Sequence, residues 1–293
     1  MSSQHDVNQS QSRGSAAAPI WWVVCSRELT DLWMGGYASI LIIIFCAVQG
    51  GIAYNLSADF GRTPRQEMVY MLIETCIAAA VFMGVILGAD TISGERERGT
   101  LEAILVTPAS RRQFIFGKFL AAFSVWPAAL GVTVPFIFFV ADGLDGFLNG
   151  MKWGTLLGTL TVAGFTGLGM LISFWSNSNK TSLFASLVAY FCFVLPTMFP
   201  WETQVGTFGI IMRRVNPMES NRHLLDKTIV SNFPIGAYWR WVLSPVLLAV
   251  IVFGLLFVYA GPFLQLEKGR ARKSFQHKRS GGRRHREALM PAD

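Results

Sequence analysis

The chain has 293 residues, of which 52% are hydrophobic and only 15% charged, a composition that excludes an ordinary soluble domain and indicates a membrane protein. The formal charge of +7 does not indicate a nucleic-acid-binding domain, because nine Lys or Arg residues and only three acidic residues lie in the last segment, 264–293. The four cysteines lack CxxC spacing, so neither a disulfide framework nor a zinc site is predicted.

Two segments precede the first long apolar run. Residues 1–19 are polar and lack the apolar core of a secretory signal peptide, so we expect a disordered cytosolic leader. Residues 20–33 place Trp21, Cys25 and Trp33 on one helical stripe and most of the charged residues on the other. We interpret this segment as an interfacial helix on the inner membrane surface. A longer first span is the alternative.

Six apolar runs follow, each long enough to cross about 30 Å of hydrocarbon as a helix of about 20 residues. Lys and Arg are more frequent on one side of these runs, and this side is predicted to be cytosolic together with both termini. The loop 201–238 departs from this rule, because its basic residues fall on the outer side. The predicted fold is an all-α integral membrane protein with six transmembrane helices and an N-terminal interfacial helix. The predicted spans are 34–56, 68–90, 114–140, 153–175, 182–200 and 241–263.

Two further patterns concern packing and the external side. Gly150, Gly154 and Gly158 are spaced four residues apart in and before the fourth span, which predicts close helix approach, within one protomer rather than at a dimer contact. The external segment 212–229 mixes charged with aliphatic residues, so part of it is predicted to form a short helix over the outer end.

A charged stretch, ISGERERGTLEAILVTPASRR (92–112), connects the second and third spans on the predicted cytosolic side. Gly94 and Gly99 interrupt it, and Pro108 is expected to end any helix just before itself. A short separate helix over about 95–106 is therefore predicted.

This predicted helix is amphipathic. Glu95 and Arg98 lie on its charged face with Glu102 and are spaced to form an ion pair. Three aliphatic residues form a ridge on another face and supply area for contact with another protein; they are Leu101, Ile104 and Leu105. The alternative is a solvated loop that merely follows the positive-inside bias.

The string ISGERERGTLEAILVTPASRRQFIFGK (92–118) resembles the signature between the second and third spans of type-2 ATP-binding-cassette (ABC) exporter permeases. The resemblance implies a permease domain over 20–263, followed by a basic cytosolic tail, and a coupling helix seated on a separate ATPase subunit. It also implies two permease subunits, or two copies of this one, above two ATPase subunits, with the permeases meeting at their first and fifth spans. The docking residues it implies, together with the aliphatic ridge, are Gly94, Glu95, Glu97, Arg98, Gly99, Thr100, Leu101, Glu102, Ile104, Leu105, Thr107, Pro108 and Arg111.

The chain contains no phosphate-binding GxxxxGK[ST] sequence. ATP and Mg are therefore expected on the partner subunit. No catalytic residue, metal or cofactor is assigned to this chain, because its four histidines lie outside the predicted spans and no HExxH sequence occurs. The tail is expected near anionic membrane lipids rather than on nucleic acid. The expected location is a bacterial plasma membrane, with the chain as a multi-pass protein.

Glu74 is the only acidic residue well inside a predicted span, about 9 Å from its start. It either lines a polar translocation path or hydrogen-bonds a neighbouring span. A lone acid without a partner gives little support to an ion-coupled secondary transporter, which is the alternative class. Another alternative keeps the ABC architecture but does mechanical work on a membrane partner without moving a solute.

Overall fold

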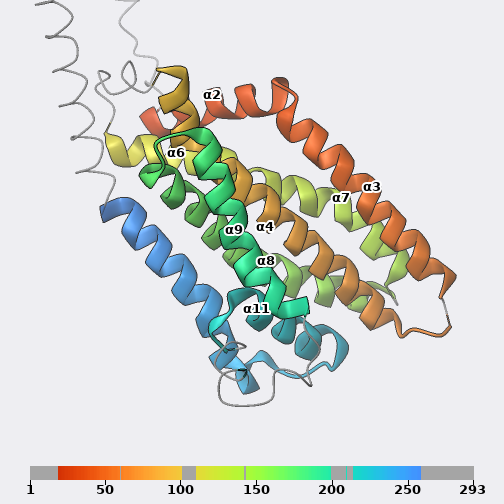
Figure 1. The fold of residues 1–293 in the computed structure, drawn as a ribbon. Coiled ribbons are helices and arrows are strands. Elements are labelled where there is room, and N and C mark those ends of the chain that lie inside the picture. The colour runs from red at the N-terminus through yellow and green to blue at the C-terminus, as the bar shows by residue number, and fades with distance from the viewer. Residues whose placement is uncertain are drawn as a thin grey trace, which may run out of the picture.

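The structure is a computed structural model, and the residues it describes are 19–59, 61–100, 110–141, 143–198, 209 and 214–258. These residues form a bundle of long α-helices with a shorter helix lying across one end (Figure 1). No β-strand occurs in these ranges. The basic tail and nearly all of the leader lie outside the described residues.

The described part of the chain contains six helical segments that are long and apolar enough to cross a membrane. They agree with the six predicted spans. Their bounds are Tyr37–Ala58 (α3), Arg65–Arg98 (α4), Arg111–Val140 (α6 and α7), Gly143–Trp175 (α8), Asn179–Met198 (α9) and Trp239–Val258. The third span consists of two helices, α6 (Arg111–Phe123) and α7 (Val125–Val140), which meet at Ser124.

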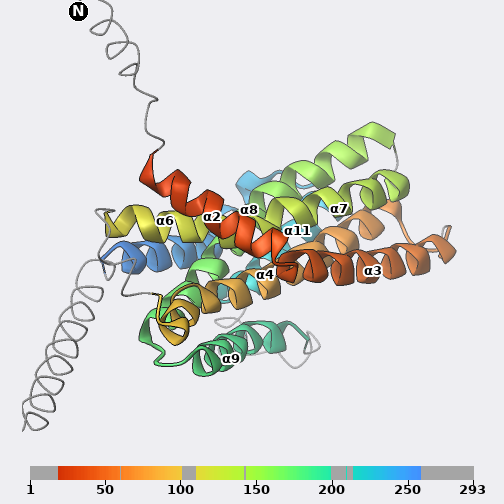
Figure 2. The same cartoon turned by 90° about the horizontal axis from the view of Figure 1, so that it is seen from above.

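The two longest helices, α4 and α8, pack against each other in the middle of the bundle (Figure 2). Their backbones approach closely because glycines lie at the contact. A Cβ atom on Gly169 of α8 would lie 2.3 Å from the carbonyl oxygen of Val85, and one on Gly88 of α4 would lie 2.3 Å from that of Thr166. Close approach of this kind lets helices associate without bulky apolar side chains between them.

The glycine series predicted to pack within one protomer does so. A Cβ atom on each of these residues would come within 3 Å of a side chain of α4 or α7, so a larger residue would force that side chain to shift. The pairs are Gly150 with Val69, Gly154 with Ile73, and Gly158 with Trp126.

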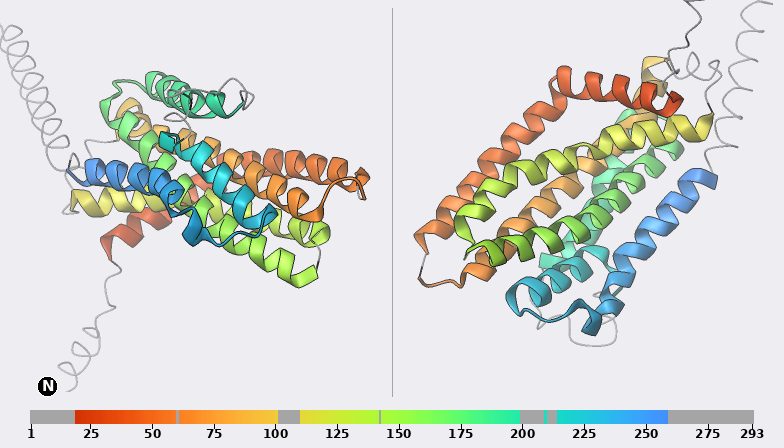
Figure 3. Two further views of the ribbon diagram at one scale, coloured as in Figure 1. Left: turned by 90° about the horizontal axis from the view of Figure 1, so that it is seen from below. Right: turned by 180° about the vertical axis from the view of Figure 1, so that it is seen from behind.

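A separate helix, α2 (Ile20–Met34), precedes the first span and turns into it at Gly36, which adopts a φ of 82°. Figure 3 shows α2 beside α6 across the end of the bundle. The contact is close, because a Cβ atom on Gly117 of α6 would lie 2.7 Å from the carbonyl oxygen of Trp21. The helix predicted over 20–33 is present. Its place at the membrane surface and the cytosolic location of the termini stay predictions.

The other end of the bundle carries α11 (Pro217–Leu225), which continues into a π-helical segment, Asp226–Val230. Asn216 caps α11, because its side chain accepts a hydrogen bond from the amide of Met218 at 3.0 Å. The short helix predicted within 212–229 is therefore confirmed. It contacts α4, α8 and α9 and covers this end (Figure 1).

Candidate functional site

The last turn of α4 leads into the connection that is predicted to dock a partner. α4 continues through Gly94 and ends at Arg98, where Gly99 adopts a φ of 71°. The amide of Thr100 then donates to the carbonyl oxygen of Glu95 at 3.1 Å, a Schellman-type ending. The prediction of a separate helix beginning at Glu95 is therefore wrong, because residues 95–98 belong to the second span.

Gly94 does not end the helix. Its lack of a side chain leaves space for neighbouring side chains. A Cβ atom there would lie 2.5 Å from Oδ1 of Asp90 and 3.0 Å from Nη2 of Arg98. These two side chains form an ion pair at 3.1 Å, and the missing side chain of Gly94 leaves room for it. The predicted ion pair between Glu95 and Arg98 is therefore also wrong, because Arg98 turns back along α4.

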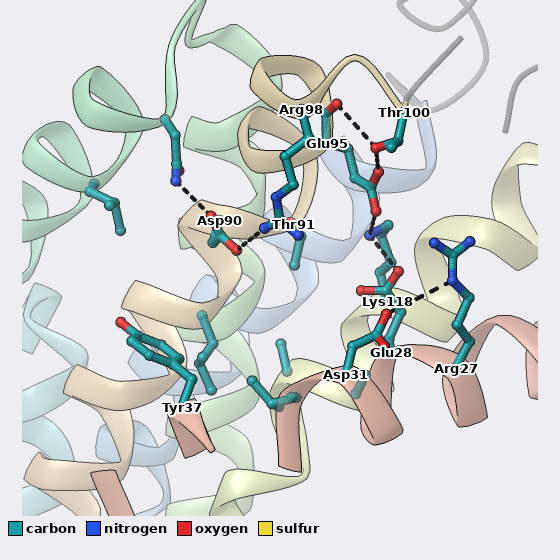
Figure 4. Close-up of a pocket in the computed structure, with 16 residues that line it drawn as sticks. Arg27, Glu28, Asp31, Tyr37, Asp90, Thr91, Glu95, Arg98, Thr100 and Lys118 are labelled. Carbon is teal, nitrogen blue, oxygen red and sulfur yellow. Dashed lines mark hydrogen bonds and ion pairs between the residues drawn. The ribbon is translucent and has the colours of Figure 1, made fainter. Parts of the chain in front are cut away.

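Glu95 is buried and faces the interior of the bundle. Its carboxylate lies 3.1 Å from Nζ of Lys118 in α6, and the same ammonium group lies 2.7 Å from Glu28 in α2. The Lys118 side chain is only 1% exposed. Thr100 donates to the second oxygen of Glu95. The cluster lies against a cavity of about 480 Å³ lined by residues of α2, α3, α4, α6 and α9 (Figure 4). It joins the last turn of α4 to two other helices.

The next two residues bond to the turn between α8 and α9. Arg96 donates to carbonyl oxygens at the end of α8, those of Phe174 (3.5 Å) and Ser176. Glu97 accepts a hydrogen bond from the backbone amide of Asn179 at the start of α9, at 3.0 Å. A cation at a helix C-terminus and an anion at an N-terminus both complement the helix dipole. Residues 95–97 thus bond directly to α6 and α9 and to the end of α8 from a single turn, and to α2 through Lys118.

The predicted docking residues fall into distinct groups. Gly94 and Glu95 are buried and so face the permease itself, whereas Glu97, Arg98 and Gly99 are exposed. Two more are partly exposed; they are Thr100 and Arg111, the first residue of α6. The remaining ones lie outside the described residues; they are Leu101, Glu102, Ile104, Leu105, Thr107 and Pro108.

Glu74 has a partner that the sequence did not reveal. Its carboxylate lies 3.1 Å from the guanidinium of Arg222 in α11. The expectation of an acid without a partner is therefore wrong, although the partner lies in α11 rather than in a neighbouring span. The translocation path past Glu74 stays a prediction. Arg222 comes from the loop 201–238, whose basic residues departed from the positive-inside rule. Among these basic residues, at least Arg222 forms an ion pair within the protein.

Sequence reasoning missed the residues that complete the site, because each is distant in sequence from its partner. Lys118 lies in the third predicted span, and a lysine within an apolar run calls for an acidic partner, but the sequence does not show which acid provides it. Asp90, at the predicted end of the second span, offered the same kind of signal. Nothing in the sequence marked Asn179.

Comparison with known proteins decides the family. Residues 3–259 match the family described as "ABC-2 family transporter protein". The chain belongs to the ABC-2 transporter family. The predicted resemblance to type-2 ABC permeases is confirmed, as is the expectation of a multi-pass protein of a bacterial inner membrane.

Two curated relatives of this ABC-2 protein carry the name "Probable ABC transporter permease protein NosY". The one from Pseudomonas aeruginosa is 30% identical over 105 residues, which is 35% of this chain and 38% of the relative. The one from Stutzerimonas stutzeri is 24% identical over 185 residues, which is 59% of this chain and 66% of the relative. The similarity thus spans less than two thirds of the length of each relative. It supports a membrane subunit of an ABC transporter.

Proposed function

We propose that this chain is the transmembrane permease subunit of an ATP-driven ABC exporter and that a separate ATPase subunit docks on the connection between α4 and α6. The observation that carries the proposal is the bonding of residues 95–97. This single turn, next to the connection, contacts α6, α8 and α9 directly and α2 through Lys118. A force applied to the connection therefore acts on most of the bundle at once.

Docking combines the exposed charges with the aliphatic ridge. Glu97, Arg98 and Gly99 are exposed at the end of α4, and Leu101, Ile104 and Leu105 supply apolar area. Apolar area contributes affinity, whereas fixed charges set the register of the contact. Gly94 and Glu95 act on the permease side of the contact.

ATP and Mg are assigned to the partner subunit. The chain contains no GxxxxGK[ST] sequence that could hold a nucleotide phosphate. The permease therefore takes no part in the chemistry of hydrolysis. Its part is to convert a movement of the docked ATPase into a change of the bundle.

α4 is suited to carry that movement. Its 34 residues extend about 50 Å at 1.5 Å per residue, from the docking end to the side of the bundle where Glu74 pairs with Arg222 of α11. ATP closes the partner ATPase pair, the connection moves, and α4 shifts against α8 and α11. The bundle then alternates between inward-open and outward-open states and passes its cargo outward.

A second permease subunit, either another copy or a homologue, is expected to complete the path. Among the spans, α9 and α3 have the smallest buried shares, 11% and 22% of their apolar windows. Their free sides carry large apolar residues that suit a second permease or lipid. These residues include Ile40, Ile43, Ile44, Phe184, Phe191 and Leu195.

An ion-coupled carrier is the alternative transporter class, and it would depend on Glu74, which pairs with Arg222 at 3.1 Å. Substrate flux through the purified permease without any ATPase, lost in Glu74→Gln, would favour it. A membrane subunit that works on a partner without moving a solute shares this architecture. Flux measured in sealed vesicles distinguishes that role from export.

Copurification of the ATPase subunit tests the proposal. Leu101→Asp should reduce the ATPase recovered with the permease at least about tenfold, because it places a charge in the apolar part of the contact. Leu144→Asp is the matched control, since Leu144 is a 63% exposed leucine of α8 far from the connection. Equal ATPase recovery with both variants would contradict the proposed docking.

A further inference from the structure

The helix α9 turns its apolar residues away from the bundle and its hydroxyl groups toward it. Large apolar side chains on its outer side are 44% to 69% exposed; they are Phe184, Val188, Phe191 and Leu195. The buried residues of α9 all carry hydroxyl groups and recur at every fourth position; they are Ser182, Ser186 and Tyr190. Their side of the helix packs on α4.

Near the start of α9 the contact with α4 is made by small side chains, whereas farther along Tyr190 packs edge-on against Phe82 of α4, with ring centroids 5.3 Å apart. Ser182 donates to the carbonyl oxygen of Ala89 in α4 at 2.8 Å, and the serines are small enough for the two backbones to come close. Bulky side chains that interdigitate would resist sliding, because packed interfaces do not deform continuously. The serines near the start of α9 offer less resistance. The position of this part of α9 on α4 therefore depends on its hydrogen bonds.

Asn179, at the start of α9, makes the strongest set of such bonds. Its amide nitrogen Nδ2 donates to Asp90 at 2.7 Å, and its Oδ1 accepts from the hydroxyl of Ser93 at 3.0 Å. Its backbone amide donates to Glu97 at 3.0 Å. The three partners lie three, four and seven residues apart on one face of α4. One residue of α9 thus holds two turns of α4, up to the turn where the docking connection begins.

We propose that Asn179 is a positioning residue that fastens the start of α9 to the ATPase-facing end of α4, so that movement of the connection is passed to α9. The inference rests on the proposed function, because it specifies a path for the ATPase movement. Asp90 strengthens this connection between α4 and α9, because its carboxylate binds Asn179 and also pairs with Arg98 at 3.1 Å. Because of the bonds of Asn179, α9 moves together with α4. It does not stay in place with whatever contacts its outer apolar side.

The first test uses the purified permease alone. Asn179→Ala removes both side-chain bonds, and hydrogen exchange of the amides in the first turns of α9 should become at least about fivefold faster. Asn55→Ala is the control, because the side chain of Asn55 bonds to Gly51 within its own helix, at 2.8 Å; it should leave exchange in α9 unchanged. Unchanged exchange in Asn179→Ala would show that this residue does not fasten α9.

The second test uses the complex with the ATPase subunit and a readout that a merely structural role would not move. Exchange is compared between the nucleotide-free complex and the complex trapped with ATP and vanadate. In the unsubstituted protein, trapping should change exchange both at residues 93–98 and in the first turns of α9. In Asn179→Ala the change at 93–98 should persist, while the change in α9 should fall to less than about a third.

The outcomes separate the two proposals. An α9 response that survives Asn179→Ala, in a complex that assembles normally, overturns the inference and leaves the proposed function intact. If no ATPase subunit assembles with the unsubstituted permease, the proposed function fails and this inference fails with it. The result with the isolated permease then still decides whether Asn179 holds α9 on α4.

Discussion

The carboxylate of Glu74 in α4 lies 3.1 Å from Nε of Arg222 in α11. The same guanidinium donates to the hydroxyl of Tyr70 at 3.2 Å and to the carbonyl oxygen of Thr197 in α9 at 2.9 Å. One arginine thus joins the short helix α11 to two spans. The side chains of the ion pair are 35% and 33% exposed, so solvent screens it in part and its stabilisation should be modest.

Removing this ion pair should loosen α11. Glu74→Gln should lower stability by about 1 kcal/mol and Arg222→Gln by about 2 kcal/mol, because Arg222 also donates to Tyr70 and Thr197. The double variant should lose less than the sum, because both losses include the shared ion pair. Thermal unfolding of the purified permease measures the three losses. Lys227→Gln serves as the control, since Lys227 pairs with its neighbour Asp226 in the same segment, at 3.2 Å. Additive losses would contradict the coupling.

The Glu28, Glu95 and Lys118 cluster should respond strongly to an unbalanced substitution. Lys118→Met leaves Glu95, which is 9% exposed, without its cation, and should lower stability by about 3 to 5 kcal/mol. The neutral triple variant Lys118→Met, Glu28→Gln, Glu95→Gln should lose much less, because no buried charge is left unpaired. Denaturant titration in detergent compares the two.

An exposed ion pair of α2 provides the control for that comparison. Arg27 and Asp31 lie 3.8 Å apart with side chains 61% and 69% exposed, so Arg27→Gln should change stability by less than about 0.5 kcal/mol. If Lys118→Met were as stable as the triple variant, the cluster would not hold its charges as described.

The close contact between α4 and α8 predicts a difference between two glycines. Gly169→Ala would place a Cβ atom 2.3 Å from the carbonyl oxygen of Val85, and the backbone cannot move aside as a side chain can. A loss of about 1 to 3 kcal/mol is expected. Gly131→Ala in α7 meets no atom within 4 Å and should be neutral or stabilise by up to about 1 kcal/mol. Equal stability of the two variants, measured by thermal unfolding, would argue against the contact.

The six spans could be predicted from the sequence because hydropathy and length alone define them. The end of α4 could not, because the helix continues through charged residues that hydropathy treats as loop. These residues remain helical where partners from other helices bond to them, as Lys118 bonds to Glu95 and Asn179 to Glu97. Gly94 was misread for a related reason, since the need for space beside Asp90 is visible only in three dimensions.

The candidate site, too, could be predicted from the sequence only in part. The sequence located the charged connection and its exposed residues Glu97 and Arg98, because a charged segment between apolar runs must lie outside the lipid. It did not show that Glu95 faces inward, because burial depends on a cation supplied by another helix. The partner of Glu74 was hidden in the same way, since Arg222 lies in a distant external segment.

The most direct test of the central claim is photocross-linking from position 101 in membranes that contain the working transporter. A photoreactive residue replacing Leu101 should form a covalent adduct with a protein that contains a GxxxxGK[ST] phosphate loop, and the adduct should depend on the intact connection. An actively transporting permease whose position 101 cross-links only to lipid or solvent, with no adduct to such a protein, would contradict the account.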